Sequence, residues 1–278
     1  MEKKLFCEIA PFTYKISVLK CCALRHTKDF FSKDKFAKTK SSEKLPYVIL
    51  LHNSLIRRRL GNTDIHLQEN KALNLSISAP KVSGILIRPG ETFSFWRLVG
   101  KISKKMGYKE GLVISNGKVG RDIGGGMCQF TNLIHWMVLH SNLTITEHHH
   151  HDGLDLFPDF GRQIPFGTGT SIFYNYIDYR FKNNTDFTYQ IIVYTTDKYL
   201  CGELRLDKEP EFKYHIYAEN EYFSKEPDGV YRNGTVKRKC VDIKTGNTVS
   251  EEIIRKNHAK VMYDTSELEI RSDLNGAK

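Results

Sequence analysis

The spacing of apolar and polar residues predicts a chain that mixes helices and strands. Apolar positions recur at helical intervals in residues 9–24, 66–75 and 128–141. Strand patterns are shorter and are concentrated after residue 83, many of them bounded by Gly, Pro or Asn turns. The predicted strands lie at residues 84–95, 112–119, 143–147, 170–181, 188–195, 199–207, 212–218 and 235–243. The predicted class is therefore α+β. Its core is a glycine loop that leads through a cysteine into a helix and then a strand, and antiparallel strands and a helical N-terminal extension are added to this core.

These patterns divide the 278 residues into three regions. Residues 1–81 read as a helical accessory region and residues 82–206 as the main domain. Residues 207–278 form a smaller β-rich C-terminal extension. A chain of this length with 40% hydrophobic residues can bury one large core.

Charge and cysteine usage restrict the partners and the compartment. The 42 Lys and Arg exceed the 32 Asp and Glu, but the basic residues are scattered and no nucleic-acid motif accompanies them. We predict no nucleic-acid partner. The remaining interpretations of the basic excess are a solvated surface, contact with an anionic membrane face, or binding of an anionic wall precursor. No run of 18 apolar residues and no secretory pattern occurs, and the six cysteines are not spaced as metal ligands. The expected location is the cytoplasm or the inner membrane face, with reduced thiols.

The run Gly124-Gly125-Gly126-Met127-Cys128 just before a helix is the strongest candidate for a site. Backbone N–H groups and the macrodipole at a helix start favour a thiolate, which is the nucleophilic form of cysteine. Glycines allow close approach of a ligand, and their N–H groups can line an oxyanion hole. Gln129 and Asn132 are predicted to add polar contacts to substrate. The alternative is a buried core cysteine behind a flexible loop.

Four consecutive histidines, residues 148–151, follow the next strand. A strand returning antiparallel to the helix brings its far end near Cys128, and alternate residues share a face. One pair, His149 with His151 or His148 with His150, is therefore expected to face the thiol and accept its proton. His135 lies about 10 Å along the helix, out of reach. An exposed histidine run and a zinc site with Cys128 are alternatives; we predict no metal and no cofactor.

Several blocks together resemble the VanW family over about residues 82–206. They are Pro89-Gly-Glu-Thr-Phe-Ser-Phe-Trp, Gly107-Tyr-Lys-Glu-Gly with Asn116-Gly-Lys, Gly124-Gly-Gly-Met-Cys-Gln-Phe-Thr-Asn, Glu147 with its histidines, and Ile177-Asp-Tyr-Arg-Phe-Lys-Asn-Asn-Thr-Asp. The resemblance implies a role in glycopeptide resistance or cell-wall metabolism. It further implies L,D-transpeptidase-like chemistry on peptidoglycan peptides, through an acyl-enzyme on Cys128. An Arg-His-Pro-His pattern in the family maps onto His149 and His151, with His151 as the preferred base.

One position departs from the family pattern. A Gly-Arg-Asp-Ala-Thr segment is expected before the next strand, whereas this chain reads Gly167-Thr-Gly-Thr-Ser, with Gly169 in the acidic position. If that acid orients the histidine, a triad would lack its third member here, unless Asp155 or Asp159 replaces it.

Whether the protein is an enzyme stays open at this point. Three functions are compatible with the sequence: a cysteine acyltransferase acting on D-Ala- or D-lactate-terminated wall peptides, a cysteine hydrolase with the same groups, and a non-catalytic accessory that binds wall precursor or a resistance partner.

Overall fold

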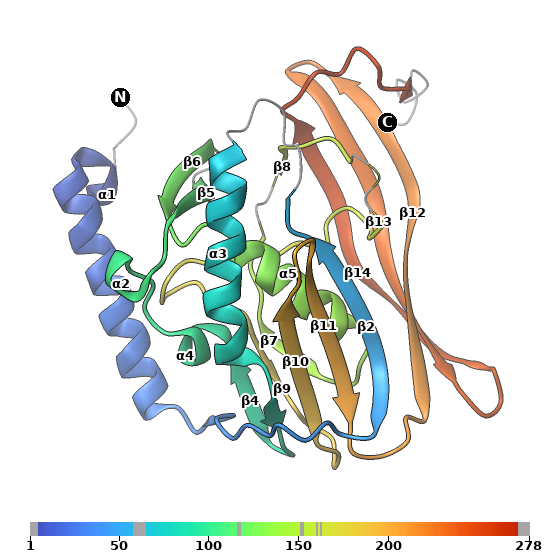
Figure 1. Cartoon of the computed structure of the whole chain (residues 1–278). Coiled ribbons are helices and arrows are strands. Elements are labelled where there is room, and N and C mark those ends of the chain that lie inside the picture. Colours follow the sequence, from blue (N-terminus) through green and yellow to red (C-terminus); the bar gives the residue numbers. More distant parts are fainter. Residues whose placement is uncertain are drawn as a thin grey trace.

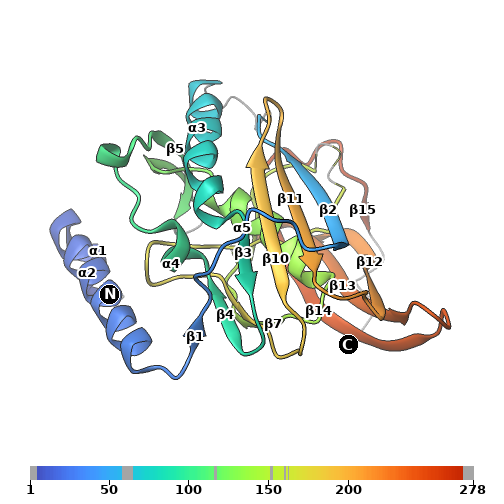
Figure 2. The same cartoon turned by 60° about the horizontal axis from the view of Figure 1, so that its bottom comes forward.

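The computed structural model describes residues 5–57, 65–115, 118–150, 153–159, 161 and 163–271. It confirms the α+β class and the N-terminal helix. Figures 1 and 2 place that helix at one edge of the molecule and a long C-terminal sheet at the other, with the remaining helices and strands between them.

Two of the described helices, those that end at Phe31 and Val82, continue past the ends that the sequence predicts, at residues 24 and 75. The helices are α1 Phe6–Ile9, α2 Pro11–Phe31, α3 Ile65–Val82, α4 Phe95–Val99, the short 3-10 helix η1 Lys104–Met106 and α5 Met127–Leu139. Pro11 is the first residue of α2, a position where its missing N–H costs nothing. The Thr13 hydroxyl accepts the N–H of Ala10 at 3.0 Å and so caps the same helix.

The central sheet has the order β2-β11-β10-β3. Its strands are β2 Tyr47–Leu55, β3 Ile85–Ile87, β10 Tyr189–Thr195 and β11 Tyr199–Leu206. Helix α5 packs on β2 and β11. Gly202 in β11 allows this approach, because a Cβ there would lie 2.9 Å from the sulfur of Met137.

A second sheet, β1-β4-β9-β7, lies beside it. Its strands are β1 Lys35–Phe36, β4 Glu91–Ser94, β9 Arg180–Lys182 and β7 Thr144–Glu147. The hairpin β5 Glu110–Ser115 and β6 Lys118–Ile123 completes the main body. The predicted Asn116-Gly117 turn lies outside the described residues. The strand predicted over 170–181 forms regular pairing only at its end, in β9, whereas Thr170 is hydrogen-bonded to Asn132 of α5 instead.

Residues predicted as an accessory region contribute directly to this core. Strand β2 pairs with β11 along its length, and α3 contributes the fully buried Leu75 and Val82. Phe93 and Phe181, from neighbouring strands, stack with their rings 4.6 Å apart at the centre. Strand β2 and helix α3 therefore share one core with the residues that follow.

The C-terminal region is a long antiparallel sheet. Its main strands are β12 Phe212–Glu226, β13 Gly229–Asp242 and β14 Thr248–Val261, flanked by the short β15 Ile270–Arg271 and β8 Leu154–Asp155. The strands predicted at 212–218 and 235–243 are parts of β12 and β13, whereas β14 had no prediction. Because β8 pairs with β14, the loop after the histidines is held against this sheet.

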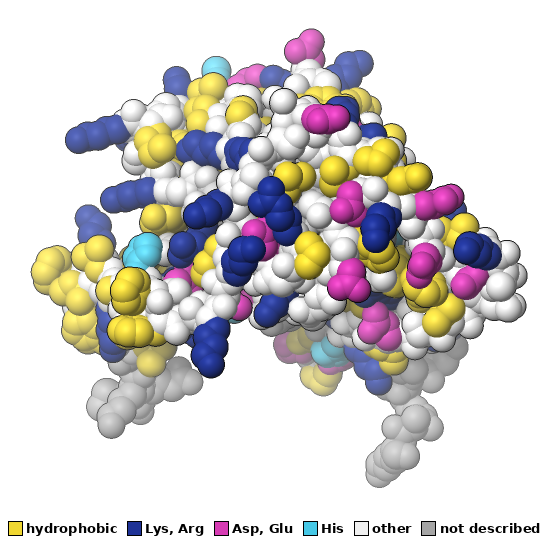
Figure 3. Space-filling view, turned by 90° about the horizontal axis from the view of Figure 1, so that it is seen from below, with side chains coloured by type: hydrophobic (Ala, Val, Ile, Leu, Met, Phe, Trp, Pro, Cys, Tyr) yellow, Lys and Arg dark blue, Asp and Glu magenta, His cyan; other side chains and the backbone are white. Residues whose placement is uncertain are grey.

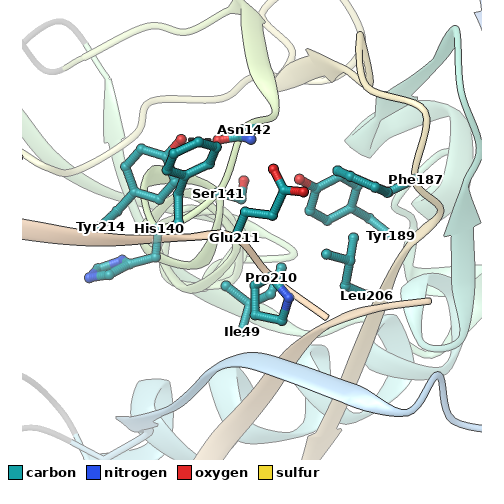
Figure 4. Close-up of a pocket in the computed structure, with 11 residues that line it drawn as sticks. Ile49, His140, Ser141, Asn142, Phe187, Tyr189, Leu206, Pro210, Glu211 and Tyr214 are labelled. Carbon is teal, nitrogen blue, oxygen red and sulfur yellow. Dashed lines mark hydrogen bonds between the residues drawn. The ribbon is translucent and has the colours of Figure 1, made fainter. Parts of the chain in front are cut away.

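The C-terminal sheet joins the main body near the end of α5 (Figure 4). The Tyr214 hydroxyl donates to the side-chain oxygen of Asn142, and Arg238 donates to the carbonyl of Ser141. The hollow beside them has a volume of about 30 Å³. Such a space holds little more than a water molecule, so this junction is structural.

Candidate functional site

The glycine run forms a tight loop that is clamped by α3 and β5. Asn74 of α3 donates to the carbonyls of Lys109 and Gly125, both at 3.0 Å. A Cβ on Gly125 would lie 2.4 Å from the backbone of Gly111. Gly126 has φ +109°, and a Cβ there would meet the Lys71 side chain at 2.6 Å. Packing and backbone conformation thus both require glycine in this loop.

Cys128 lies in the first turn of α5, directly after the loop, as predicted. Its side chain is partly buried and packs against the core. Burial raises the pKa of the Cys128 thiol, although the backbone N–H of Ile172 and its own N–H oppose that shift. Desolvation is the largest influence on this pKa and outweighs the two N–H groups, whereas the prediction from the sequence considered only groups that favour the thiolate.

A cavity of about 560 Å³ opens beside Cys128. The glycine loop and the start of α5 form one wall, and Trp96, Ile102 and the β5–β6 hairpin form the next. The segment that follows the histidines forms a third wall. Arg255, Asn257 and His258 of β14 line another part of the cavity. This part was missed in the sequence, because no local pattern connects β14 with a cysteine so distant in the chain.

Gln129 and Asn132 both line the cavity, and both also hold the structure around it. The Gln129 amide nitrogen donates to the hydroxyl of Ser54 and to the carbonyl of Leu55, each at 2.9 Å, which ties α5 to β2. The Asn132 side-chain oxygen accepts the N–H of Thr170 at 2.7 Å and its hydroxyl at 2.8 Å. That contact fixes the segment in which the N–H of Ile172, two residues after Thr170, reaches Cys128.

The structure separates the histidines onto alternate faces, as the period of two predicts. His150 lines the cavity with Cys128. His149 points elsewhere: its ring is 43% exposed and its Nε2–H donates to Glu147 at 3.1 Å. His151, the preferred base, lies outside the described residues.

A row of imidazoles leads from His150 into the core. The centroid of the His148 ring lies 3.9 Å from the centroid of the His150 ring and 4.1 Å from the centroid of the His135 ring. The His148 Nε2–H donates to the carbonyl of Gly169 at 3.0 Å. His135 is buried against the Tyr179 hydroxyl at 3.0 Å, and burial with the charges of His148 and His150 lowers its pKa well below the usual value. The sequence indicated the pair His148 and His150 but not its contact with His135.

Gly169 thus contributes a backbone carbonyl where the family pattern has an acid. A Cβ at Gly169 would make only an ordinary contact of 3.8 Å with Asn132, so the position has room for a side chain. Asp155 and Asp159, the predicted substitutes, are both engaged by Arg232 of β13, at 3.6 and 2.6 Å. Asp155 also accepts from the Tyr263 hydroxyl at 3.0 Å.

Glu147 anchors the base of the histidine segment. Arg25 of α2 donates to both of its carboxylate oxygens, at 2.7 and 2.6 Å, and Asp178 donates a backbone N–H at 2.9 Å. Burial alone would raise the pKa of Glu147, but these donors outweigh it and the net shift is downward. Asp29 and Arg180 form a second two-bond pair beside it, at 2.7 and 2.8 Å.

Among the described residues, no group of three or more His, Cys, Asp or Glu side chains is placed to hold a metal ion. Within the same part of the chain, none of the helices combines the length and the apolar character needed to cross a bilayer.

Comparisons with known proteins are consistent with the motifs. The family model described as VanW like protein matches residues 70–205. The vancomycin B-type resistance protein VanW of Enterococcus faecalis (strain ATCC 700802 / V583) is 36% identical over 232 residues, which is 84% of this chain and 84% of that protein. The uncharacterized protein YoaR of Bacillus subtilis (strain 168) is 28% identical over 118 residues, 41% of this chain and 36% of that protein. No solved structure gives a significant match.

Proposed function

Because the chain belongs to the VanW family, we propose that it acts in cell-wall metabolism linked to vancomycin resistance, as a cysteine acyltransferase on peptidoglycan peptides. The proposed nucleophile is Cys128. The observation that carries the proposal is that Cys128 and His150 line one cavity at the N-terminus of α5. A volume of about 560 Å³ is that of a ligand site and accommodates a short peptide end.

The proposed reaction has two steps. Sγ of Cys128 attacks the carbonyl carbon of the donor peptide, and the thiol proton passes to a histidine. The tetrahedral oxyanion is stabilised by N–H groups at the start of α5, and its collapse releases the terminal D-Ala amine or D-lactate alcohol, which takes the proton. An acceptor amine then attacks the thioester carbonyl and restores the thiol. If water attacks instead, the same groups make a hydrolase.

The raised pKa of Cys128 makes the base essential in this scheme. A thiol that is protonated at neutral pH must lose its proton as the bond forms, so a histidine must be within reach. His150 is the proposed acceptor among the described histidines. Its neighbour His148 is oriented by the Gly169 carbonyl and packs behind it, which fixes the ring.

Two observations favour a second candidate, a non-catalytic accessory that binds wall precursor or a resistance partner in the same cavity. Packing already accounts for the glycines, and the Cys128 thiol is held in its less reactive form. In that case the cavity would bind peptide with Cys128 as part of its wall.

The test is mass spectrometry of the protein after incubation with a synthetic stem peptide ending in D-Ala. We expect an acyl adduct on Cys128 that is absent from Cys128→Ala and present in the matched variant Cys201→Ala. Transfer to an added amine identifies the transferase, and release by water alone identifies the hydrolase. Peptide binding by calorimetry with no adduct in the wild type would establish the accessory function instead.

Single substitutions distinguish the contributions of the histidines to acylation. We expect His150→Ala to slow acylation by about 10²-fold or more, the usual contribution of a general base. His149→Ala, whose ring points out of the cavity, should change the rate by less than about threefold. A loss confined to His151→Ala would assign the base to the residue that the family resemblance favours and overturn the role of His150.

A further inference from the structure

Helix α2 attaches to the body along one side only. The attachment uses Cys22, whose Sγ contacts the Tyr174 carbonyl at 3.6 Å, with the ion pairs of Arg25 and Asp29. Side-chain hydrogen bonds and buried charges therefore hold this helix in place, instead of a broad apolar contact. Figures 1 and 2 both show it standing at the edge of the molecule.

The side of α1 and α2 that is turned away carries an uncovered apolar surface. Phe12, Ile16, Leu19 and Ala23 follow one another at intervals of four, three and four residues, which places them in one stripe. The exposed apolar side chains that form the surface are those of Leu5, Phe6, Ile9, Phe12, Ile16, Leu19, Leu24, Phe30 and Phe31. Figure 3 shows hydrophobic side chains gathered at this corner, with Lys and Arg beside them.

The charges of α2 complement an anionic surface. Lys15, Lys20 and Lys28 are exposed. Asp29, the acidic residue of α2, is buried in its pair with Arg180 and presents no charge outward. Long lysine stems lie along apolar surface while their ammonium groups reach the headgroup layer. A helix with an apolar stripe and basic flanks binds in the plane of an interface.

We propose that the α1–α2 face docks on an anionic phospholipid bilayer, with the helix lying in the plane of the membrane surface. Phe12, Ile16, Leu19 and Phe30 enter the acyl boundary, and Lys15 and Lys20 contact lipid phosphates. The ion pairs of Arg25 and Asp29 then fix the angle at which the body stands on the surface. The proposal is independent of chemistry at Cys128.

The experiment is vesicle co-sedimentation of the full chain. With vesicles of phosphatidylglycerol and phosphatidylcholine we expect binding that is at least about tenfold stronger than with phosphatidylcholine alone, and that weakens with salt. Leu19→Asp should reduce partitioning about tenfold or more, because one leucine side chain no longer enters the apolar layer. Lys20→Gln should reduce it about fivefold.

The matched control is Leu51→Asp in β2. Leu51 is 63% exposed and Leu19 is 69% exposed. Both variants therefore replace an exposed leucine with aspartate, and they differ only in where that leucine lies. Leu51→Asp and Cys128→Ala should bind vesicles as the wild type does. Equal binding to neutral vesicles, equal loss in Leu51→Asp, or no vesicle binding overturns the proposal. A dimer in light scattering that Leu19→Asp dissociates, without vesicle binding, would assign the face to a second copy.

Discussion

At the scale of single residues, the position of Cys128 and the ionisation of its thiol have different physical causes. A glycine run before a helical pattern predicts the position of Cys128 at the first turn, and the structure places it there. The direction of its pKa depends on burial, to which residues from distant parts of the chain contribute as walls of the cavity. The same holds for the histidines: a period of two predicts the two faces, whereas the register that turns His150 inward is set by β7 and β9.

Alkylation of Cys128 should follow its raised pKa. Only the thiolate reacts, so at pH 7 we expect peptide-level labelling by iodoacetamide to be slower at Cys128 than in the same protein unfolded in urea. The native rate should increase about tenfold per pH unit and continue to rise above the pH at which the unfolded protein levels off. A native rate that is constant from pH 6 to 8 would instead indicate a thiolate paired with a histidine.

At the scale of elements, predictability followed the strength of the local pattern. Helices α2, α3 and α5 have apolar positions at helical spacing, and each was predicted within a few residues at its start. Strand β14 was missed because Thr248–Val261 is rich in charged residues and its first six residues are exposed on both faces, so apolar and polar positions do not alternate. Its role as a cavity wall depends on pairing with β8 and β13, which no single segment encodes.

The glycine loop offers a test of packing at this scale. We expect Gly125→Ala to lower the free energy of unfolding by about 2 kcal/mol, because the new Cβ meets the Gly111 backbone, which cannot rotate away. The matched control is Gly120→Ala in β6, whose Cβ would make an ordinary contact of 3.8 Å with Val113. Urea denaturation measures both. Equal midpoints for Gly125→Ala and the wild type would show that the loop is loose enough to adapt.

At the scale of the whole molecule, two peripheral elements are joined to the central body by different kinds of interaction. The C-terminal sheet is attached through strand pairing and the Tyr214 and Arg238 contacts. Helix α2 is attached through Glu147, Asp29 and their arginines. The helix itself was predictable, but its docking was not, because ion pairs across more than 120 residues leave no periodic signal. The Glu147 pair also connects α2 with the strand that carries the histidines.

That connection can be tested with Glu147→Gln, which mimics protonation. The lowered pKa of Glu147 means that its contribution to docking is complete at neutral pH and is lost as the pH falls through the folded-state pKa, below the ordinary value. The variant should show this loss already at pH 7, because Arg25 is left without its charged partner. We expect the free energy that holds α2 on the body to fall by about 2 kcal/mol. Amide exchange in Pro11–Phe31 should then be about thirtyfold faster. Exchange in β10 and β11 should not change.

The matched control is Glu69→Gln, which removes an ion pair that is half exposed, with Arg57 at 2.5 Å. Pairs of that kind contribute little, so exchange in α2 should match the wild type. If Glu147→Gln also left α2 protected, the other contacts of the helix would be sufficient to hold it, and the pair of Arg25 with Glu147 would contribute little to docking. If α2 were released and acylation at Cys128 slowed as well, the helix and the histidine segment would be energetically coupled. The orientation of the protein on a membrane and the geometry of its cavity would then depend on the same carboxylate.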